Sequence, residues 1–464
     1  MVNSAKDYFA VTILFVINLL NYVDRETVAG VLDDVQHYYD INDTLAGLIQ
    51  TVFLVFFVIA SPICGYLGDR YNRKWVICVG MSIWVAAVIG SSVIPSNMFW
   101  LFLLLRGIVG VGEASYSNVS PSMICDMFTG QIRNRIYMVY YLAVPCGSGL
   151  GYMVGSNISS LTGHWQWGVR CTAIAGLIGI AILAFLIPEP ERGASDKEDE
   201  EKELIIEPLE PSSIWQDLYS ICTNVTFINC TIAYTSLVFV AGTMLWWTPT
   251  AAEHRLAWER NLTSTHKLSD KDKDKINMLF GIITLASGII GVVSGTFLSW
   301  ALQEGKLGLG RFKTDRAPPI ICSIGATLAL PLMFITILMN DDSAVALWIL
   351  SFFSITFLCF NWGLNVDIVM SVVVPWRRST AFSWFMLSSH LLGDGPGPYI
   401  IGAISDAIRT DDTPLAHYKS LVAAFSSLLG LLVASSVMYA VTALTLLKDK
   451  EKVNEEILRN SKQQ

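Results

Sequence analysis

Long apolar stretches separated by short polar turns run along most of the chain. Each is at least about 20 residues long, which is what an α-helix rising 1.5 Å per residue needs to cross roughly 30 Å of hydrocarbon. The twelve stretches fall near residues 8–30, 44–67, 74–95, 98–125, 134–158, 167–187, 224–252, 275–303, 317–339, 344–370, 377–405 and 416–447. The pattern predicts an all-α polytopic membrane protein with twelve transmembrane helices.

One long polar interruption divides these helices into two sets of six. It contains the run 196–203, which is too charged to enter lipid and too poor in apolar residues to fold alone. The parts predicted are an N-terminal six-helix half (1–187), an acidic cytosolic linker (188–222), a C-terminal six-helix half (223–447) and a cytosolic tail (448–464). Within the linker, Ile214–Tyr219 is predicted to form a short amphipathic helix on the membrane surface.

The composition excludes several classes of protein. Hydrophobic residues make up 53% of the chain and charged residues 15%, against about 25% charged residues in soluble domains. The net charge of −8 offers no cationic surface, so we expect no nucleic-acid partner. The nine cysteines lie in or near apolar segments without a CxxC pair, so we expect no metal and no cofactor.

Basic residues gather on the side of the membrane that holds the N-terminus, which predicts that both termini are cytosolic. One connection disagrees, because residues 253–275 would lie outside and yet carry six bases interleaved with five acids. Glycosylation sequons at Asn42, Asn157 and Asn261 fall on the predicted outer side.

A pattern in the first half recurs in the second. Asn118-Val119-Ser120 and the glycine-rich run 147–151 have counterparts in Asn365-Val366-Asp367 and 393–397. This favours two repeats of one fold with a substrate site at the midplane between them. The alternative is that glycine-rich helices recur in any membrane protein, since small residues let helices approach closely.

The segment Gly65–Lys74 resembles the signature cytoplasmic loop of the major facilitator superfamily. Glycines let two helices pack at a tight turn, and a carboxylate there can hold a neighbouring helix end in one of two rocking states. The gating residues predicted on this basis are Gly65, Asp69, Arg70 and Arg73. Under the alternative interpretation, the bases of the loop only set membrane topology.

Further segments resemble one family within that superfamily. They are Asn21–Leu32, Arg106–Ala114, Arg377–Ala381 and Ser389–Asp394. Together they closely resemble the Spinster family of lipid transporters, over nearly all of the chain from Asn21 to about Asp406. The resemblance implies alternating access and a substrate such as a lysophospholipid or sphingosine 1-phosphate. The sequence departs from the family pattern at Gly395–Pro398, inside the predicted eleventh helix.

Three ionisable residues stand in apolar helices of the first half. Arg106 and Glu113 are seven residues apart and so share a face of one helix, and Asp24 lies in the first helix. Charges in hydrocarbon are costly and usually functional. We predict that Arg106 pairs with Asp24 or with a lipid phosphate, and that Asp24 and Glu113 carry protons. The alternative is a static pair that only holds the helices together.

In the second half, His390 and Asp394 are four residues apart and share a helix face, which predicts a sensor of acidity or a purely structural histidine. Trp246, Asn361 and Trp362 are further candidates for substrate binding, with aromatic packing as the alternative.

The hypothesis that follows is a proton-linked secondary transporter of a single-chain lipid, not an enzyme, which acts as a monomer in the bilayer. A facilitator-type carrier of a polar solute or drug, and a membrane receptor without transport, are the rivals. The string Glu200–Ile205 has the form of an acidic dileucine signal and favours a lysosomal or late endosomal membrane over the plasma membrane.

Overall fold

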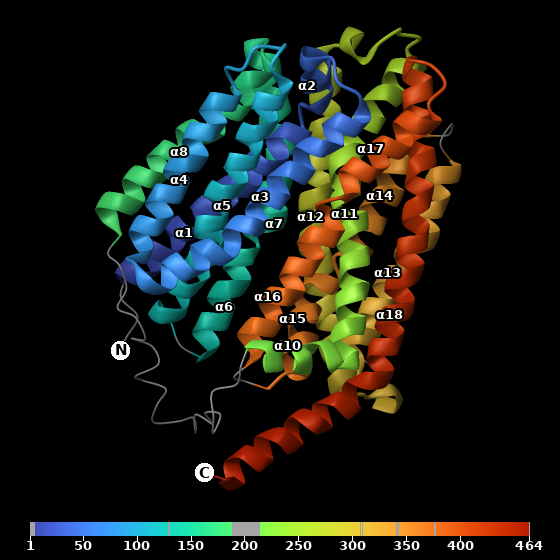
Figure 1. Cartoon of the computed structure of the whole chain (residues 1–464). Coiled ribbons are helices and arrows are strands. Elements are labelled where there is room, and N and C mark those ends of the chain that lie inside the picture. Colours follow the sequence, from blue (N-terminus) through green and yellow to red (C-terminus); the bar gives the residue numbers. More distant parts are fainter. Residues whose placement is uncertain are drawn as a thin grey trace. The chain divides into compact units, whose positions relative to one another are not determined.

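The computed structural model describes residues 5–128, 130–187, 214–306, 308, 310–339, 343–374 and 377–463. Throughout these residues the regular secondary structure is helical (Figure 1). The predicted signal Glu200–Ile205, with most of the predicted linker, lies outside the described residues.

The first half contains α1 (Ala5–Ala29), α2 (Leu32–Tyr39), α3 (Asp43–Arg70), α4 (Arg73–Ser91), α5 (Phe99–Met127), α6 (Gly130–Tyr141), α7 (Ala143–Thr162) and α8 (Trp165–Leu186). After the linker come α10 (Ile214–Thr223), α11 (Val225–Glu259), η1 (Thr265–Lys267), α12 (Asp270–Glu304), η2 (Gly310–Phe312), α13 (Ala317–Leu338), α14 (Ala344–Leu358), α15 (Asn361–Ser371), α16 (Arg378–Ser389), η4 (His390–Asp394), α17 (Gly397–Ile408) and α18 (Pro414–Gln463). The helix predicted within 214–219 corresponds to α10, and its place on the membrane surface stays a prediction.

Twelve membrane-crossing segments follow from these elements. Ten segments among the described residues are long and apolar enough to cross a membrane, and α14 with α15 form one of them. The other two are the segments predicted at 134–158 and 377–405, which the structure divides into α6–α7 and α16–η4–α17. The twelve-helix fold in two halves is therefore confirmed, but these two helices are not continuous as predicted.

Proline accounts for both divisions. Pro145 has no N–H to give to the carbonyl four residues earlier, and its ring clashes with that carbonyl, so the helix breaks at Leu142. Pro396 and Pro398 act in the same way between η4 and α17. The helix accommodates this change with a π turn, in which the N–H of Gly395 donates to the carbonyl of His390 at 3.0 Å.

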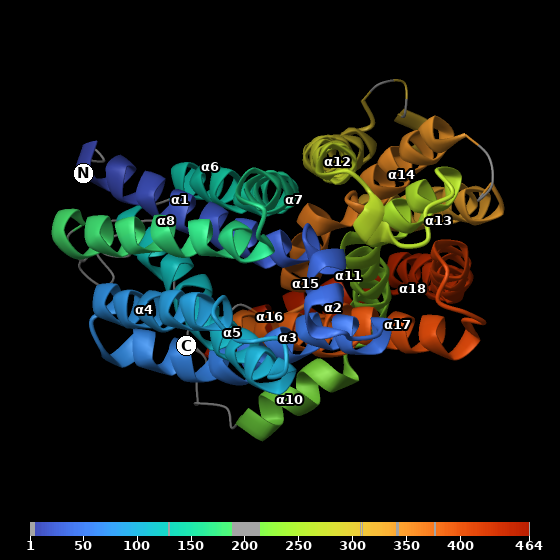
Figure 2. The ribbon, with the colours of Figure 1, turned by 90° about the horizontal axis from the view of Figure 1, so that it is seen from above.

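Two compact units are present in the chain. The first comprises 1–204, 245–285 and 398–421, and the second comprises 205–244, 286–397 and 422–464. The first unit thus joins the N-terminal half to one end of α11, α12, α17 and α18; this end also holds α2, and we call it the α2 end. Within this unit α1 packs against α7 and α8, and α5 packs against α3 and α4 (Figure 2).

Close packing at the first unit's seam depends on two glycines. A Cβ added to Gly149 of α7 would lie 2.5 Å from the carbonyl oxygen of Gly281 in α12, and one added to Gly281 would clash with the carbonyl of Gly149. Any side chain at either position would push the two helices apart.

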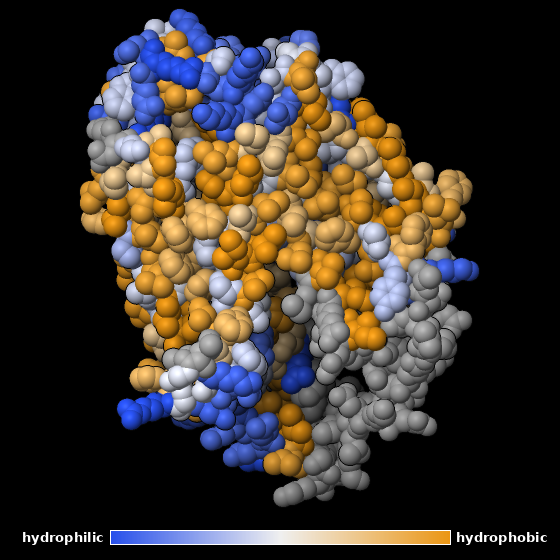
Figure 3. All heavy atoms as spheres, turned by 180° about the vertical axis from the view of Figure 1, so that it is seen from behind, coloured by the Kyte–Doolittle hydropathy of each residue, from blue (hydrophilic) through white to orange (hydrophobic). Residues whose placement is uncertain are grey.

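Hydrophobic side chains form a broad band on the face drawn in Figure 3, with hydrophilic side chains toward its ends. Large apolar side chains are strongly exposed, including Phe185 at 86% and Ile59 at 62%. A soluble protein would not leave so many in water, so this surface fits contact with lipid.

The connection 253–275, whose bases disagree with the predicted topology, is rich in ion pairs. Arg255 pairs with Glu259, Arg260 with Asp272, and Lys273 with Asp33 and Asp34. Three of its six bases are therefore paired with acids in the described structure. The sequon residues Asn42, Asn157 and Asn261 are exposed at the same end of the first unit.

Candidate functional site

Asp24 of α1 and Arg106 of α5 form a buried ion pair. Arg106 Nη1 lies 3.7 Å from Asp24 Oδ2, and the residues are 2% and 1% exposed. Asp24 also accepts hydrogen bonds from Trp84 Nε1 of α4 at 3.1 Å and from Thr172 Oγ1 of α8 at 2.5 Å. The carboxylate thus connects four helices. Its pairing with Arg106 is one of the two alternatives predicted for that arginine.

The guanidinium of Arg106 is only partly satisfied. Its Nε and Nη1 make no hydrogen bond within the described part of the chain. Buried donors normally have a partner, and an orphaned donor suggests an acceptor that binds at some stage of the cycle. The planar fork of an arginine is suited to a carboxylate or a phosphate.

Glu113 lies two turns along α5 from Arg106 and is 4% exposed. It accepts a hydrogen bond from Asn21 Nδ2 of α1, a residue three positions before Asp24. Over the described residues, no ion pair joins Glu113 to Arg106. The proton-carrying role predicted for Glu113 stays a prediction.

Several buried hydroxyl groups lie on α5 and α6 of the first half. Tyr116 and Ser120 of α5 and Tyr140 of α6 each have a buried hydroxyl without a hydrogen-bond partner among the described residues. These hydroxyl groups have spare hydrogen-bonding capacity, which water or a polar headgroup can use.

Two neighbours of Asp24 were not predicted as site residues. Glu26 is buried, and its Oε2 lies 2.9 Å from the hydroxyl of Tyr152 in α7, which is also 2.7 Å from the carbonyl oxygen of Leu245 in α11. Arg25 lies over the ring of Phe53 at 5.6 Å. Their signal in the sequence is the uninterrupted charged triplet 24–26 within an apolar span, whereas nothing local marks Trp84 or Thr172.

His390 and Asp394 share a face, as predicted. His390 Nδ1 lies 3.0 Å from Asp394 Oδ1 within the π turn of η4. Asp394 also packs closely on α11, since a Cβ on Gly242 would lie 2.6 Å from its Cβ. The turn therefore holds the pair against α11 of the second unit.

Trp246, Asn361 and Trp362 are divided between the two units. Trp246 is 2% exposed and belongs to the first unit, whereas Asn361, with 0% exposure, and the half-buried Trp362 belong to the second. Trp246 Nε1 and Asn361 Oδ1 are buried without a partner among the described residues. Their role in substrate binding stays a prediction.

The predicted gating loop is the turn between α3 and α4. Arg70 ends α3 and lies over the ring of Tyr66 at 4.4 Å, and the buried Arg73 begins α4. A Cβ on Gly65 would meet nothing within 4 Å, whereas one on Gly68 would lie 2.8 Å from Val119 of α5. Close packing in this conformation thus needs Gly68 more than Gly65.

Asp69 lies in the last turn of α3, but its side chain is outside the described part of the structure. Its gating role stays a prediction.

One group of described residues has the geometry of a metal site. The ligand atoms of Asp33, Asp34 and His266 lie within 4.8 Å of one another at the α2 end. The ammonium of Lys273 already binds both carboxylates, at 2.8 and 2.6 Å, and occupies the position that a cation would take.

Comparison with known proteins identifies similar sequences. Residues 14–398 match the profile of the Major Facilitator Superfamily. Protein spinster homolog 1 of Homo sapiens is 40% identical over 413 residues, which cover 89% of this chain and 76% of that protein. The sphingosine-1-phosphate transporter SPNS2 of Mus musculus is 36% identical over 443 residues, which cover 95% of this chain and 78% of that protein.

A solved structure supports the fold. The crystal structure of a bacterial homologue of the human lysosomal transporter Spinster, in an inward-facing and occupied conformation, superposes with a TM-score of 0.78. The match covers 96% of this chain and 98% of that chain at 18% identity. Both comparisons agree with the twelve-helix arrangement.

Proposed function

Because the chain belongs to the Spinster family of the major facilitator superfamily, we propose that it moves a single-chain lipid across the membrane in a proton-linked cycle of alternating access. The lipid is a lysophospholipid or a sphingoid lipid such as sphingosine 1-phosphate. We place the protein in a lysosomal or late endosomal membrane as a monomer, with both termini cytosolic and the α2 end facing the lumen.

The observation that carries this proposal is the buried guanidinium of Arg106, two of whose nitrogens lack a described partner. A lysolipid and a sphingoid phosphate share an anionic phosphate, which a guanidinium binds through two parallel hydrogen bonds. The mouse relative is named as a transporter of such a lipid. The exposed apolar band of the protein would let the acyl chain stay in contact with hydrocarbon.

Proton coupling is assigned to Glu113 with Asp24 as its counterpart. Asp24 is stabilised as a carboxylate by Arg106, Trp84 and Thr172, whereas Asn21 is the donor described for Glu113. Hydrogen bonds to the charged form and nearby opposite charge keep a carboxyl group ionised. Glu113 is therefore the group to which we assign the proton, and its protonation leaves Arg106 more strongly positive toward an arriving anion.

The lumenal orientation of the α2 end has its own support. Three sequon residues are exposed there, and three of the six bases of the connection 253–275 are in ion pairs with acids. The signature loop between α3 and α4 lies at the opposite end of those helices, on the side assigned to the cytosol.

Flux in proteoliposomes tests the proposal. Vesicles containing the purified protein receive a lysophosphatidylcholine, a lysophosphatidylethanolamine, sphingosine 1-phosphate or xylose, with the two compartments at equal or different pH. We expect flux of at least one of the lipids, increased when the donor compartment is acidic, and none of xylose. Xylose flux without lipid flux would favour a polar-solute carrier, and lipid flux indifferent to the pH difference would remove proton coupling.

A further inference from the structure

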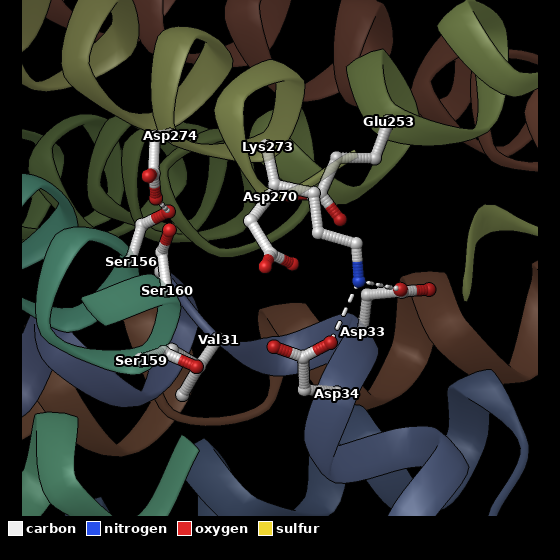
Figure 4. A pocket seen from close by; sticks show the side chains of 11 residues that line it. Val31, Asp33, Asp34, Ser156, Ser159, Ser160, Glu253, Asp270, Lys273 and Asp274 are labelled. Atoms are coloured by element: carbon white, nitrogen blue, oxygen red, sulfur yellow. Dashed lines mark hydrogen bonds and ion pairs between the residues drawn. The ribbon is translucent and has the colours of Figure 1, made fainter. Parts of the chain in front are cut away.

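The α2 end of the first unit is closed by two ion-pair clusters that connect segments of the two halves. In the first, Lys273 of α12 donates to Asp33 and Asp34 of α2 (Figure 4). In the second, Arg409, which follows α17, donates to Asp43 of α3 at 2.9 Å. We call these two clusters the α2-end closure.

Histidines gather between and beside these clusters. The chain has six histidines. Besides the exposed His164, four of them lie at the α2 end: His37, His254, His266 and His417. The rings of His254 in α11 and His417 in α18 are stacked, with centroids 4.5 Å apart and planes 1° from parallel. The rings of His37 and His266 lie 3.5 Å apart.

The contacts of His417 indicate that its ring is neutral in this closed arrangement. Arg409 Nη1 lies 3.0 Å from His417 Nδ1. A guanidinium has no lone pair to offer, so it must donate, and Nδ1 must accept without a proton of its own. A proton on Nδ1 would remove that hydrogen bond and put two cations in contact.

In the described structure His254 also lacks the access to water and the full set of hydrogen-bond acceptors that a charged imidazolium needs. It is 7% exposed, and its Nδ1 has no hydrogen-bond partner within the described residues. A charge there would be buried and would face the ring of His417. Buried neutral imidazoles of this kind take up a proton more easily once the site opens and water enters.

Charged side chains face both histidines. Asp43 Oδ2 lies 3.9 Å from His417 Nδ1, and Asp412 Oδ1 lies 4.0 Å from its Nε2. Asp43 is already engaged by Arg409, Ser405 and Gln36, and the 95% exposed side chain of Asp412 is screened by water. For His254, the facing charges are Asp33 and Asp43 on one side and Arg409 on the other.

Asp33, one of the two carboxylates bound to Lys273, stays ionised throughout the range in which histidines titrate. Burial alone would raise the pKa of Asp33, but Lys273 and its other neighbours hold that pKa at about 2. By contrast, burial lowers the pKa of His266, which favours its neutral form in the closed arrangement. The ordinary pKa of a histidine, about 6.5, lies between pH 7 and 5, so these histidines can change charge there. The buried carboxyl of Glu253, which lines the pocket beside Lys273, is a further titratable group at this end.

We propose that His254 and His417 form a proton-binding site that opens the α2-end closure when its compartment becomes acidic. Protonation breaks the contact between Arg409 and His417 and adds positive charge beside Arg409, which weakens its grip on Asp43. An acidic lumen thereby favours the conformation that admits lipid from the lumen. The assignment of this compartment to the lumen rests on the proposed function, whereas the acid-driven opening is independent of it.

Thiol labelling tests the opening without any transport. Ser160 lines the small polar pocket beside Lys273 (Figure 4), so Ser160→Cys reports access to the closure. The experiment uses full-length protein with the exposed Cys222 replaced by serine, held in lipid nanodiscs so that a maleimide reaches both faces. Leu161→Cys, at a position 85% exposed, corrects for the effect of pH on the thiol itself.

We expect the corrected labelling rate of Ser160→Cys to rise about threefold or more between pH 7.5 and pH 5, as a population shift toward the open state requires. The variant His254→Phe/His417→Gln keeps an aromatic ring and an acceptor for Arg409 but cannot gain the charge, so its rate should stay low. His164→Gln, which removes an exposed histidine from the same end, should label like the parent.

A parent rate that does not change with pH, or a double variant that keeps the full rise, would overturn the inference. If the double variant is not recovered as folded protein, the two single variants give the same test, and each should lose part of the rise. Absence of lipid flux together with intact acid-dependent labelling would count against the proposed function alone.

Discussion

Arg106 Nη1 lies 3.7 Å from Asp24 Oδ2 in the interior of the first half, while Asp24 has two further donors and Arg106 has two nitrogens without a described acceptor. The pair is thus asymmetric: the carboxylate is fully engaged and the guanidinium retains binding capacity. This asymmetry separates a functional pair from one that only holds helices together, and the predictions for the two residues differ accordingly.

Arg106→Lys should reduce lipid flux even though it keeps the positive charge. An ammonium loses the fork that binds a phosphate through two hydrogen bonds. Bonds to charged groups contribute about 1.5 to 3 kcal/mol, so flux should fall roughly tenfold to a hundredfold. Arg170→Lys is the matched control, because Arg170 of α8 binds Ser92 near the α2 end. Equal flux in the two variants, at equal protein levels, would exclude Arg106 from the binding site.

Asp24→Asn should act mainly on stability. It leaves Arg106 buried without its counter-charge, and breaking a buried pair on one side costs about 3 to 5 kcal/mol. We expect a clear fall in the thermal unfolding midpoint of the purified protein. Asp315→Asn, at an exposed position, should leave the midpoint unchanged. An Asp24→Asn protein as stable as the parent would mean that another group compensates Arg106.

Glu113→Gln should make flux less sensitive to pH. Glutamine mimics the protonated carboxyl and can still accept the hydrogen bond from Asn21. Flux should therefore remain, with its increase at acidic lumenal pH reduced. Glu259→Gln, which removes a half-exposed partner of Arg255, is the control. A full pH response in Glu113→Gln would remove the coupling role from Glu113 and leave the pH dependence to Asp24, to His390 or to the site formed by His254 and His417.

Asp69→Asn should slow turnover more than it weakens binding. A gating carboxylate biases the balance between inward-facing and outward-facing states and does not touch substrate. Flux at saturating lipid should fall, while the concentration for half-maximal flux changes little. Unchanged turnover at normal protein levels would remove the gating role.

Asp33→Asn should loosen the α2 end already at neutral pH. The pKa of Asp33 at about 2 is below the value of about 3.9 for an unfolded chain. Its contribution to stability is therefore complete above about pH 4 and is lost only as the pH falls through about 2. The variant should label faster at Ser160→Cys near pH 7, whereas acidification to pH 5 should not abolish the Lys273 contact in the parent. Labelling equal to the parent at pH 7 would show that this cluster does not hold the closure.

Much of the membrane architecture follows from local sequence. Apolar length alone predicts the spans, because a helix must satisfy its backbone hydrogen bonds within the bilayer. Helix periodicity places Arg106 with Glu113 and His390 with Asp394, and the cost of a charge in hydrocarbon predicts that Arg106 has a partner. The structure has Asp24 as that partner. Pro145, Pro396 and Pro398 mark the two helix breaks in the sequence. The apolar pattern does not predict these breaks, because it continues through the prolines.

The tertiary structure alone decided which distant residues meet. Sequence alone shows that Lys273 and Asp33 are charged groups near helix ends. It does not pair them, because surface charge has no periodicity and any acid at that end was an equal candidate for Lys273. Only the packing of α12 against the first half, which the Gly149 and Gly281 contact permits, brings Lys273 to Asp33 and Asp34. The stack of His254 on His417 depends in the same way on where α11 and α18 end in space, and no spacing along the chain encodes it.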